Sequence, residues 1–196
     1  MTGRTNNEMN LSIIIKGMKA HIALTAICLT ALLCGCTKQN RESLYATQEE
    51  RIDSYINSLV ESNPGYSVIH NNGSNRIIMQ GGTGPALAPG GTVSFYYAGY
   101  MFTTNISASN LFATNSEAVA TENGWSVSDA DFSVKTVSLN DEDLIEGLVN
   151  GLEGVRAGEI CLIVFSGKYG FGKRQIGTIP ANSALAYQIW VESVSE

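Results

Sequence analysis

Few side chains with reactive chemistry occur in the sequence beyond residue 36. The one histidine there, His70, falls on a predicted strand near a turn, and a lone histidine is more typical of a surface position than of a catalyst. The acidic run 141–143 would suit a calcium or acid–base site, but it is also typical of a solvent-facing helix N-terminus. Cys161 precedes an apolar run and is expected to be an inert core thiol.

Motifs for metal, nucleotide or triad chemistry do not occur in this part of the sequence. It has no zinc-ligand spacing, no Gly-rich phosphate loop and no G-x-S-x-G. The formal net charge is −6, which disfavours a nucleic-acid partner because contacts to phosphates need a basic surface. We therefore expect no cofactor, no metal and no nucleic acid, and we look for the chemistry among apolar and aromatic side chains.

Four short motifs follow one another between Gly90 and Val194. They read VSFYYAG, LIEGLVNGLEGVRAGE, KYGFG and IPANSAL, and they begin at Val93, Leu144, Lys168 and Ile179. In this order and spacing they resemble the FKBP-type peptidyl-prolyl cis-trans isomerase family. Its corresponding motifs are a V-x-Y-x-G strand, a V-I-x-G-W/L helix, a Y-G-x-G loop and an I-P segment that leads into the last strand. The alternative is an unrelated β-rich lipoprotein domain.

The resemblance implies an α+β fold in which a twisted antiparallel sheet wraps around a short helix, with an apolar proline pocket between them. An extra N-terminal helix precedes this domain. The implied site also includes a backbone N–H, that of Ile145, which can donate to the bound peptide. By position in the motifs, the implied catalytic residues are Tyr97, Phe112, Ile145, Leu148, Phe171, Ile179 and Tyr187, and the implied substrate-binding residues are Phe132 and Leu144.

The activity that the resemblance implies suits a site without charged catalysts. Rotation about a peptide bond has a barrier of ~18–20 kcal/mol, which comes from resonance in the planar bond. An apolar pocket that strips water from the imide carbonyl and holds the proline ring twisted favours the rotated state. Proline-containing polypeptides are the implied partners, and no cofactor is required.

Three positions depart from the family pattern. Ala113 stands where the family usually has aspartate, Phe171 replaces the loop tyrosine, and Leu148 replaces the tryptophan on the pocket floor. The missing tyrosine hydroxyl would bond the substrate carbonyl, and the loss of such a bond costs ~0.5–1.5 kcal/mol. The sequence is therefore also compatible with a weak or inactive peptide-binding lipoprotein, or with a structural lipoprotein whose pocket is degenerate.

The predicted elements place these motifs on an antiparallel sheet. We expect a helix from Thr47, through a capping box with Glu50, to Asn63. Its apolar stripe could pack on the domain or on a second copy. Strands are expected at 66–70, 76–80, 92–99, 132–139, 159–166 and 184–194, with a bulged strand near 110–114 and a short helix at 141–150. Residues 101–131 otherwise read as irregular.

The N-terminal segment has the layout of a secretory signal. A basic start at Met18 is followed by the uncharged run 22–33 and by Leu33-Cys34-Gly35-Cys36, which resembles a bacterial lipobox with Cys36 as the lipidated residue. The alternative is an uncleaved anchor. We therefore predict a signal peptide at 1–35, a lipidated tether at 36–43, a helix and hairpin at 44–89 and an FKBP-like domain at 90–196. The protein would be attached to the bacterial cell envelope, on the periplasmic or outer side, by its lipid alone.

Overall fold

The computed structural model describes residues 38–127 and 131–195. The contacts divide the chain into two units, Met1–Leu44 and Tyr45–Glu196. The described part of the first unit, residues 38–44, is helical and carries an ion pair between Lys38 and Glu42 at 3.8 Å. The second unit holds the sheet and every site discussed below.

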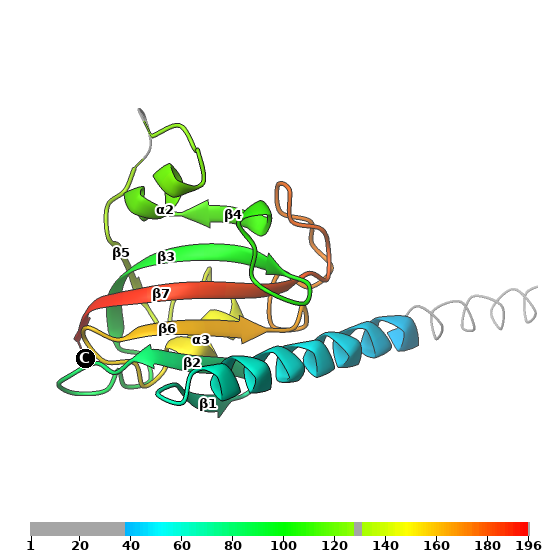
Figure 1. Cartoon of the computed structure of the whole chain (residues 1–196), viewed down its shortest axis with the longest axis horizontal. Coiled ribbons are helices and arrows are strands. Elements are labelled where there is room, and N and C mark those ends of the chain that lie inside the picture. Colours follow the sequence, from blue (N-terminus) through cyan, green and yellow to red (C-terminus); the bar gives the residue numbers. More distant parts are fainter. Residues whose placement is uncertain (1–37, 128–130, 196) are drawn as a thin grey trace, which may run out of the picture. The chain divides into compact units, whose positions relative to one another are not determined.

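One antiparallel sheet forms the centre of the second unit (Figure 1). Its strand order is β1-β2-β6-β7-β3-β4, and β5 also pairs with β3. The fold class expected from the sequence is confirmed. The strands are β1 (Ser67–Asn71), β2 (Ser74–Gln80), β3 (Thr92–Phe102), β4 (Leu111–Thr114), β5 (Lys135–Ser138), β6 (Ile160–Phe165) and β7 (Ala184–Ser195).

The first two strands form the hairpin expected within residues 44–89, and Asn72-Gly73 makes its turn. Both turn residues have positive φ, 46° for Asn72 and 82° for Gly73, as a two-residue hairpin loop requires. A Cβ at position 73 would also lie 2.1 Å from the Tyr169 ring, so this glycine lets the turn approach the loop that follows β6.

Helix α3 (Glu146–Leu152) packs closely on the sheet through its glycines. A Cβ on Gly147 would lie 2.4 Å from the Phe165 ring, and one on Gly151 would lie 2.3 Å from Ile163. The Ser74 hydroxyl donates to the Gly147 carbonyl at 2.9 Å. This close approach fixes the start of α3, which borders the candidate site.

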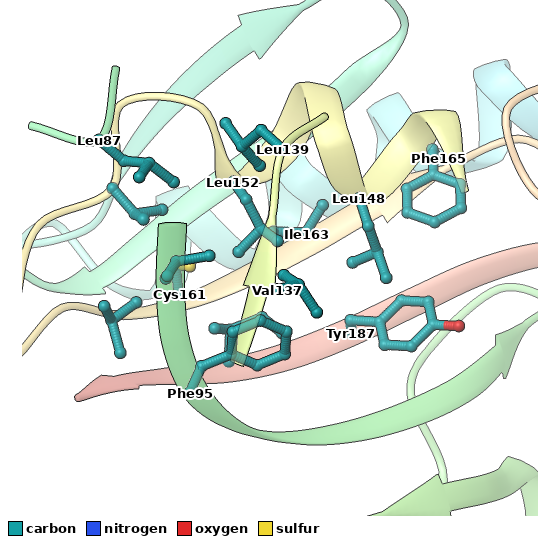
Figure 2. Packing of buried hydrophobic residues seen from close by; sticks show 14 of the residues in the cluster. Leu87, Phe95, Val137, Leu139, Leu148, Leu152, Cys161, Ile163, Phe165 and Tyr187 are labelled. Carbon is teal, nitrogen blue, oxygen red and sulfur yellow. The ribbon is translucent and has the colours of Figure 1, made fainter. Parts of the chain in front are cut away.

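Two apolar cores lie in this unit. The larger one includes Leu148 and Leu152 of α3 with Phe95, Phe165 and Tyr187 of the sheet (Figure 2). In the other core, Ile52 and Ile56 of the N-terminal helix (38–62) are buried among sheet residues such as Tyr100, Phe102 and Leu162. The apolar stripe of this helix therefore packs on its own domain.

Several predicted boundaries are wrong. Residues 38–43, expected to be part of a tether, are helical, so the helix does not begin at Thr47; Lys38, Gln39, Arg41 and Glu42 all favour helix. Helix α3 begins at Glu146, and the acidic run 141–143 is an exposed turn before it.

Other differences fall in the segment between β3 and β5. Strand β3 continues to Phe102 because β7 pairs with it along its whole length. A 3-10 turn, η1 (Ala108–Asn110), and helix α2 (Glu117–Glu122) occur where irregular chain was expected. Strand β5 begins at Lys135, so Phe132 lies outside it.

Candidate functional site

A cavity of about 270 Å³ opens between the start of α3 and strands β3, β4, β5 and β7. Apolar and aromatic side chains make up most of its wall. The lining residues are Phe95, Tyr97, Phe112, Ala113, Lys135, Val137, Asp143, Leu144, Ile145, Leu148, Phe171 and Tyr187.

Strand register brings the aromatic side chains to this cavity. Phe95 and Tyr97 are two positions apart on β3 and so project from the same face. Gly99 pairs with Tyr187 on β7. A Cβ on Gly99 would lie 2.8 Å from the Phe112 ring and 3.0 Å from the Tyr187 ring, so the glycine lets these two rings meet over the strand.

Tyr187 is the centre of the aromatic cluster. Its ring centroid lies 5.8 Å from that of Phe112 in a T-shaped contact and 6.3 Å from that of Tyr97. On its inner side it stacks with Phe165 at 6.0 Å, and Figure 2 shows Leu148 above the same ring. Aromatic contacts at these spacings hold the rings in fixed mutual orientations.

The tyrosine hydroxyls of the cavity are neutral at physiological pH, and burial extends this neutrality to more alkaline pH. Desolvation raises the pKa of Tyr187 far above its ordinary value, and it also raises the pKa of Tyr97, which is half-buried. The two charged lining residues, Lys135 and Asp143, are both exposed. The inner wall is therefore uncharged across the physiological pH range.

The start of α3 presents a free backbone donor to the cavity. Ile145 is the residue before the helix, and its carbonyl accepts from Leu148 and Val149 at 2.9 and 3.1 Å. Among the described residues none accepts a bond from its own backbone N–H. Gly147 N–H, by contrast, donates to the Tyr169 carbonyl at 2.8 Å, which joins α3 to the loop that carries Phe171.

The structure brings together seven of the nine residues that the sequence implied for the pocket: Tyr97, Phe112, Leu144, Ile145, Leu148, Phe171 and Tyr187. Ile179 does not line the cavity; it is 5% exposed and belongs to the core beside it. Phe132 also lies outside the lining, because it precedes β5 in irregular chain. Cys36 lies outside the described residues.

Sequence reasoning missed several lining residues. Phe95 could have been found from its alternation with Tyr97, and Val137 from its place on the strand that carries Lys135. Asn115 is a supporting residue without a sequence signal. Its side chain accepts from Tyr97 N–H at 2.6 Å and donates to the Ser133 carbonyl at 2.9 Å, so it ties the end of β4 to β3.

The described residues contain no group of three or more His, Cys, Asp or Glu side chains placed to hold a metal ion. The cavity offers instead an apolar hollow, aromatic walls and, at Ile145, a backbone N–H for which no acceptor is found among the described residues. Such a site can desolvate and orient a small apolar ring whose neighbouring carbonyl accepts a hydrogen bond.

Comparisons with known proteins relate the chain to one family. The family model described as FKBP-type peptidyl-prolyl cis-trans isomerase matches residues 84–192. FK506-binding protein 1 of Aspergillus oryzae is 24% identical over 117 residues, which are 60% of this chain and 94% of that protein.

Two solved structures share the fold at low sequence identity. A peptidyl-prolyl cis-trans isomerase from Pseudomonas syringae is 17% identical with a TM-score of 0.55, over 79% of this chain and 96% of that chain. FkpA from Escherichia coli is 16% identical with a TM-score of 0.52, over 98% of this chain and 84% of that chain.

Proposed function

Because the chain belongs to the family of FKBP-type peptidyl-prolyl cis-trans isomerases, we propose that its cavity binds the proline ring of a polypeptide and catalyses rotation about the preceding peptide bond. The observation that carries this proposal is the hollow of about 270 Å³ between α3 and the sheet. Tyr97, Phe112 and Tyr187 stand around it as one aromatic cluster.

Each part of the cavity has a role in this reaction. Leu148 forms the floor on which the proline ring rests, and the aromatic walls exclude water from the imide. Loss of water disfavours the planar, resonance-polarised bond relative to the twisted one. The N–H of Ile145 donates to a carbonyl of the bound peptide and fixes the peptide's direction. No proton transfer and no covalent intermediate are needed, so the mechanism requires no cofactor.

A second candidate is a domain that binds proline-containing chains with little or no catalysis. The observation that favours it is the absence of polar side chains at two places in the lining, Ala113 and Phe171. An apolar lining still binds the proline ring. At these two positions it offers no side-chain hydrogen bond to the twisted imide, so the transition state is stabilised less.

Exchange spectroscopy by NMR on an X-Pro tetrapeptide separates the two candidates, because it measures binding and cis–trans exchange in one sample. An isomerase accelerates exchange in a saturable way, whereas a binding module shifts the peptide resonances and leaves the exchange rate at its buffer value. We expect Phe112→Ala to reduce acceleration by at least about tenfold. Trp125→Ala is the matched control, since Trp125 is 39% exposed and lies outside the cavity lining.

The proposed cellular role is assistance to protein folding outside the cytoplasm, from a lipid anchor on Cys36. Within residues 38–127 and 131–195, none of the helices combines the length and apolarity needed to cross a bilayer. Labelling with a radioactive fatty acid in a bacterial host tests the anchor. Cys36→Ala should abolish label and membrane association, while Cys34→Ala should keep both; a labelled Cys36→Ala chain would overturn the anchor proposal.

A further inference from the structure

The loop between β6 and β7 supplies Phe171 to the cavity and is closed at its base by very close backbone contact. A Cβ on Gly167 would lie 2.2 Å from the Asn182 carbonyl oxygen, so only glycine fits there. Gly172, next to Phe171, is bonded to both sides of the base: its N–H donates to the Gly167 carbonyl at 3.2 Å, and its carbonyl accepts from Asn182 N–H at 2.6 Å. The position of Phe171 therefore depends on the position of the loop base, which is formed by Gly167 and Asn182.

One side chain of the N-terminal helix spans this base. The amide of Gln48 donates from Nε2 to the Asn182 carbonyl at 2.8 Å and accepts at Oε1 from Gly167 N–H at 2.9 Å. Because one partner is an acceptor and the other a donor, both hydrogen bonds need an amide, and its orientation is fixed by them.

Two neighbours of Gln48 reinforce the same contact. The Tyr45 hydroxyl donates to the side-chain oxygen of Asn182 at 2.7 Å, and the Ser166 hydroxyl donates to Glu49 at 3.1 Å. Asn182 has a φ of 61°, in the left-handed region, which asparagine adopts more readily than other non-glycine residues. The helix thus forms hydrogen bonds with both ends of the loop, near Gly167 and Asn182, whereas residues 173–178 of the loop are exposed.

We propose that Gln48 is a positioning residue of the proline pocket, which holds the loop base so that Phe171 stands at the cavity wall. The phenyl ring of Phe171 has no polar atom to anchor it, so its place is set through the backbone. This inference rests on the proposed function, and it makes the N-terminal helix part of the site although the helix precedes the residues that the family model matches.

The first test compares Gln48→Met with Gln80→Met. Methionine keeps the length and removes both hydrogen bonds. Gln80 makes one exposed bond to the Gly158 carbonyl, which precedes β6, whereas the loop follows that strand. We expect Gln48→Met to lower kcat/KM for the X-Pro peptide by about three- to tenfold, well below its melting temperature, and to speed amide hydrogen exchange at Gly167 and Gly172. Equal kcat/KM in the two variants would overturn the proposal.

The second test uses Gln48→Glu. If Gln48 only stabilised the fold, the kcat/KM of this variant relative to wild type would not change with pH. The ionised carboxylate accepts from Gly167 but cannot donate to Asn182, whereas the protonated acid can do both. The variant's kcat/KM relative to wild type should therefore rise as the pH falls from about 7 to about 4.5. The titratable groups beside this position, Tyr45, Glu49 and Lys168, are present in both proteins, so the ratio removes their own titration and leaves that of the introduced carboxyl with its coupling to them. A ratio that does not change with pH would contradict the inference.

Failure of the proposed function gives a different result. A wild-type protein that neither binds nor isomerises the peptide would refute the isomerase and the binding candidates together. In that case the amide exchange of Gly167 and Gly172 still decides whether Gln48 fixes the loop, and unchanged exchange in Gln48→Met would refute the positioning role as well.

Discussion

Phe171 places a phenyl ring without a hydroxyl at the wall of the cavity. A tyrosine there would place a hydroxyl at the cavity wall, where it could donate to the substrate carbonyl. We expect Phe171→Tyr to raise kcat/KM by about two- to tenfold, since one such bond contributes ~0.5–1.5 kcal/mol. Peptide exchange kinetics measure the change, and Tyr96→Phe, which alters a hydroxyl outside the cavity lining, should have no effect. A fall in kcat/KM for Phe171→Tyr would refute the claim that a hydroxyl at this position can donate to the substrate carbonyl.

The buried hydroxyl of Tyr187 makes stability depend on alkaline pH. Burial raises the pKa of Tyr187 in the folded state above its ordinary value of 10.0. The unfolded chain therefore loses this proton first, so the stabilisation is complete below that pH and is lost as the pH rises above it. We expect the melting temperature to fall progressively as the pH rises above about 10, and to fall less in Tyr187→Phe.

Tyr97→Phe should also reduce the alkaline fall in melting temperature, but by less than Tyr187→Phe. Tyr97 is only half-buried, and its pKa is raised by desolvation alone. Identical alkaline profiles for wild type and Tyr187→Phe would contradict the burial of that hydroxyl.

Individual pocket residues were predictable where a motif fixed their spacing. Tyr97, Leu148 and Phe171 sit inside short motifs, and each lines the cavity. Phe132 follows a long segment whose length the motifs do not constrain, so its assignment depended on alignment across that segment. Ile179 has the right neighbour, Pro180, but its side chain turns into the core, and an apolar side chain carries no sign of which cavity it faces.

The element that sets the pocket floor, α3, is tied to the sheet by Arg76, which is also a member of a buried ion pair. Arg76 of β2 and Glu159 face each other at 3.4 Å, and their side chains are 4% and 3% exposed. Arg76 also donates from one guanidinium nitrogen to the carbonyls of Gly151 and Glu153 at 3.1 and 2.7 Å, at the end of α3. Arg76 thus supplies donors to carbonyls at the end of the helix that have no partner within it.

Breaking this pair from one side should be costly. We expect Arg76→Leu to lower the free energy of unfolding by ~3–5 kcal/mol, because Glu159 is left as an uncompensated buried charge. The double variant Arg76→Leu/Glu159→Leu should lose less than the single variant, and urea titration of both measures the difference. A double variant that is less stable than Arg76→Leu would show that the pair itself, and not the stranded charge, dominates.

The sequence predicted that most helices and strands exist better than it predicted the residues at which they begin and end. The acidic run 141–143 is typical of a helix N-terminus, but the chain forms a separate turn there, closed by a bond from Asp143 N–H to the Asp141 side chain at 3.0 Å. Acidic side chains favour both a helix start and an Asx turn, and only packing against the sheet chooses between them. Helix α2 is capped by Ser116. Such a cap is hard to recognise from the sequence, because many Asn, Ser and Thr residues in the same segment could equally serve as a helix cap.

The whole molecule uses both faces of one sheet, and the sequence motifs describe only one of them. The face toward α3 holds the pocket and falls mostly within residues 84–192, the part that the family model matches. The other face is covered by the N-terminal helix, whose contacts have large sequence separation and no motif. Periodicity predicted that this helix has an apolar stripe but could not decide what the stripe packs against.

Covering that second face should contribute substantially to stability. Ile52 is 1% exposed and packs in the core that includes Ile56 and Phe102. Ile52→Ala removes three buried carbons and leaves a cavity, so we expect the free energy of unfolding to fall by ~2–5 kcal/mol in urea titration. Asp53→Ala, at the adjacent exposed position of the same helix, should change it by less than ~0.5 kcal/mol. Because Ile52 does not touch the cavity, kcat/KM at low temperature should stay within about twofold of wild type, in contrast to Gln48→Met. An Ile52→Ala chain as stable as Asp53→Ala would mean that the helix does not pack on the sheet in solution.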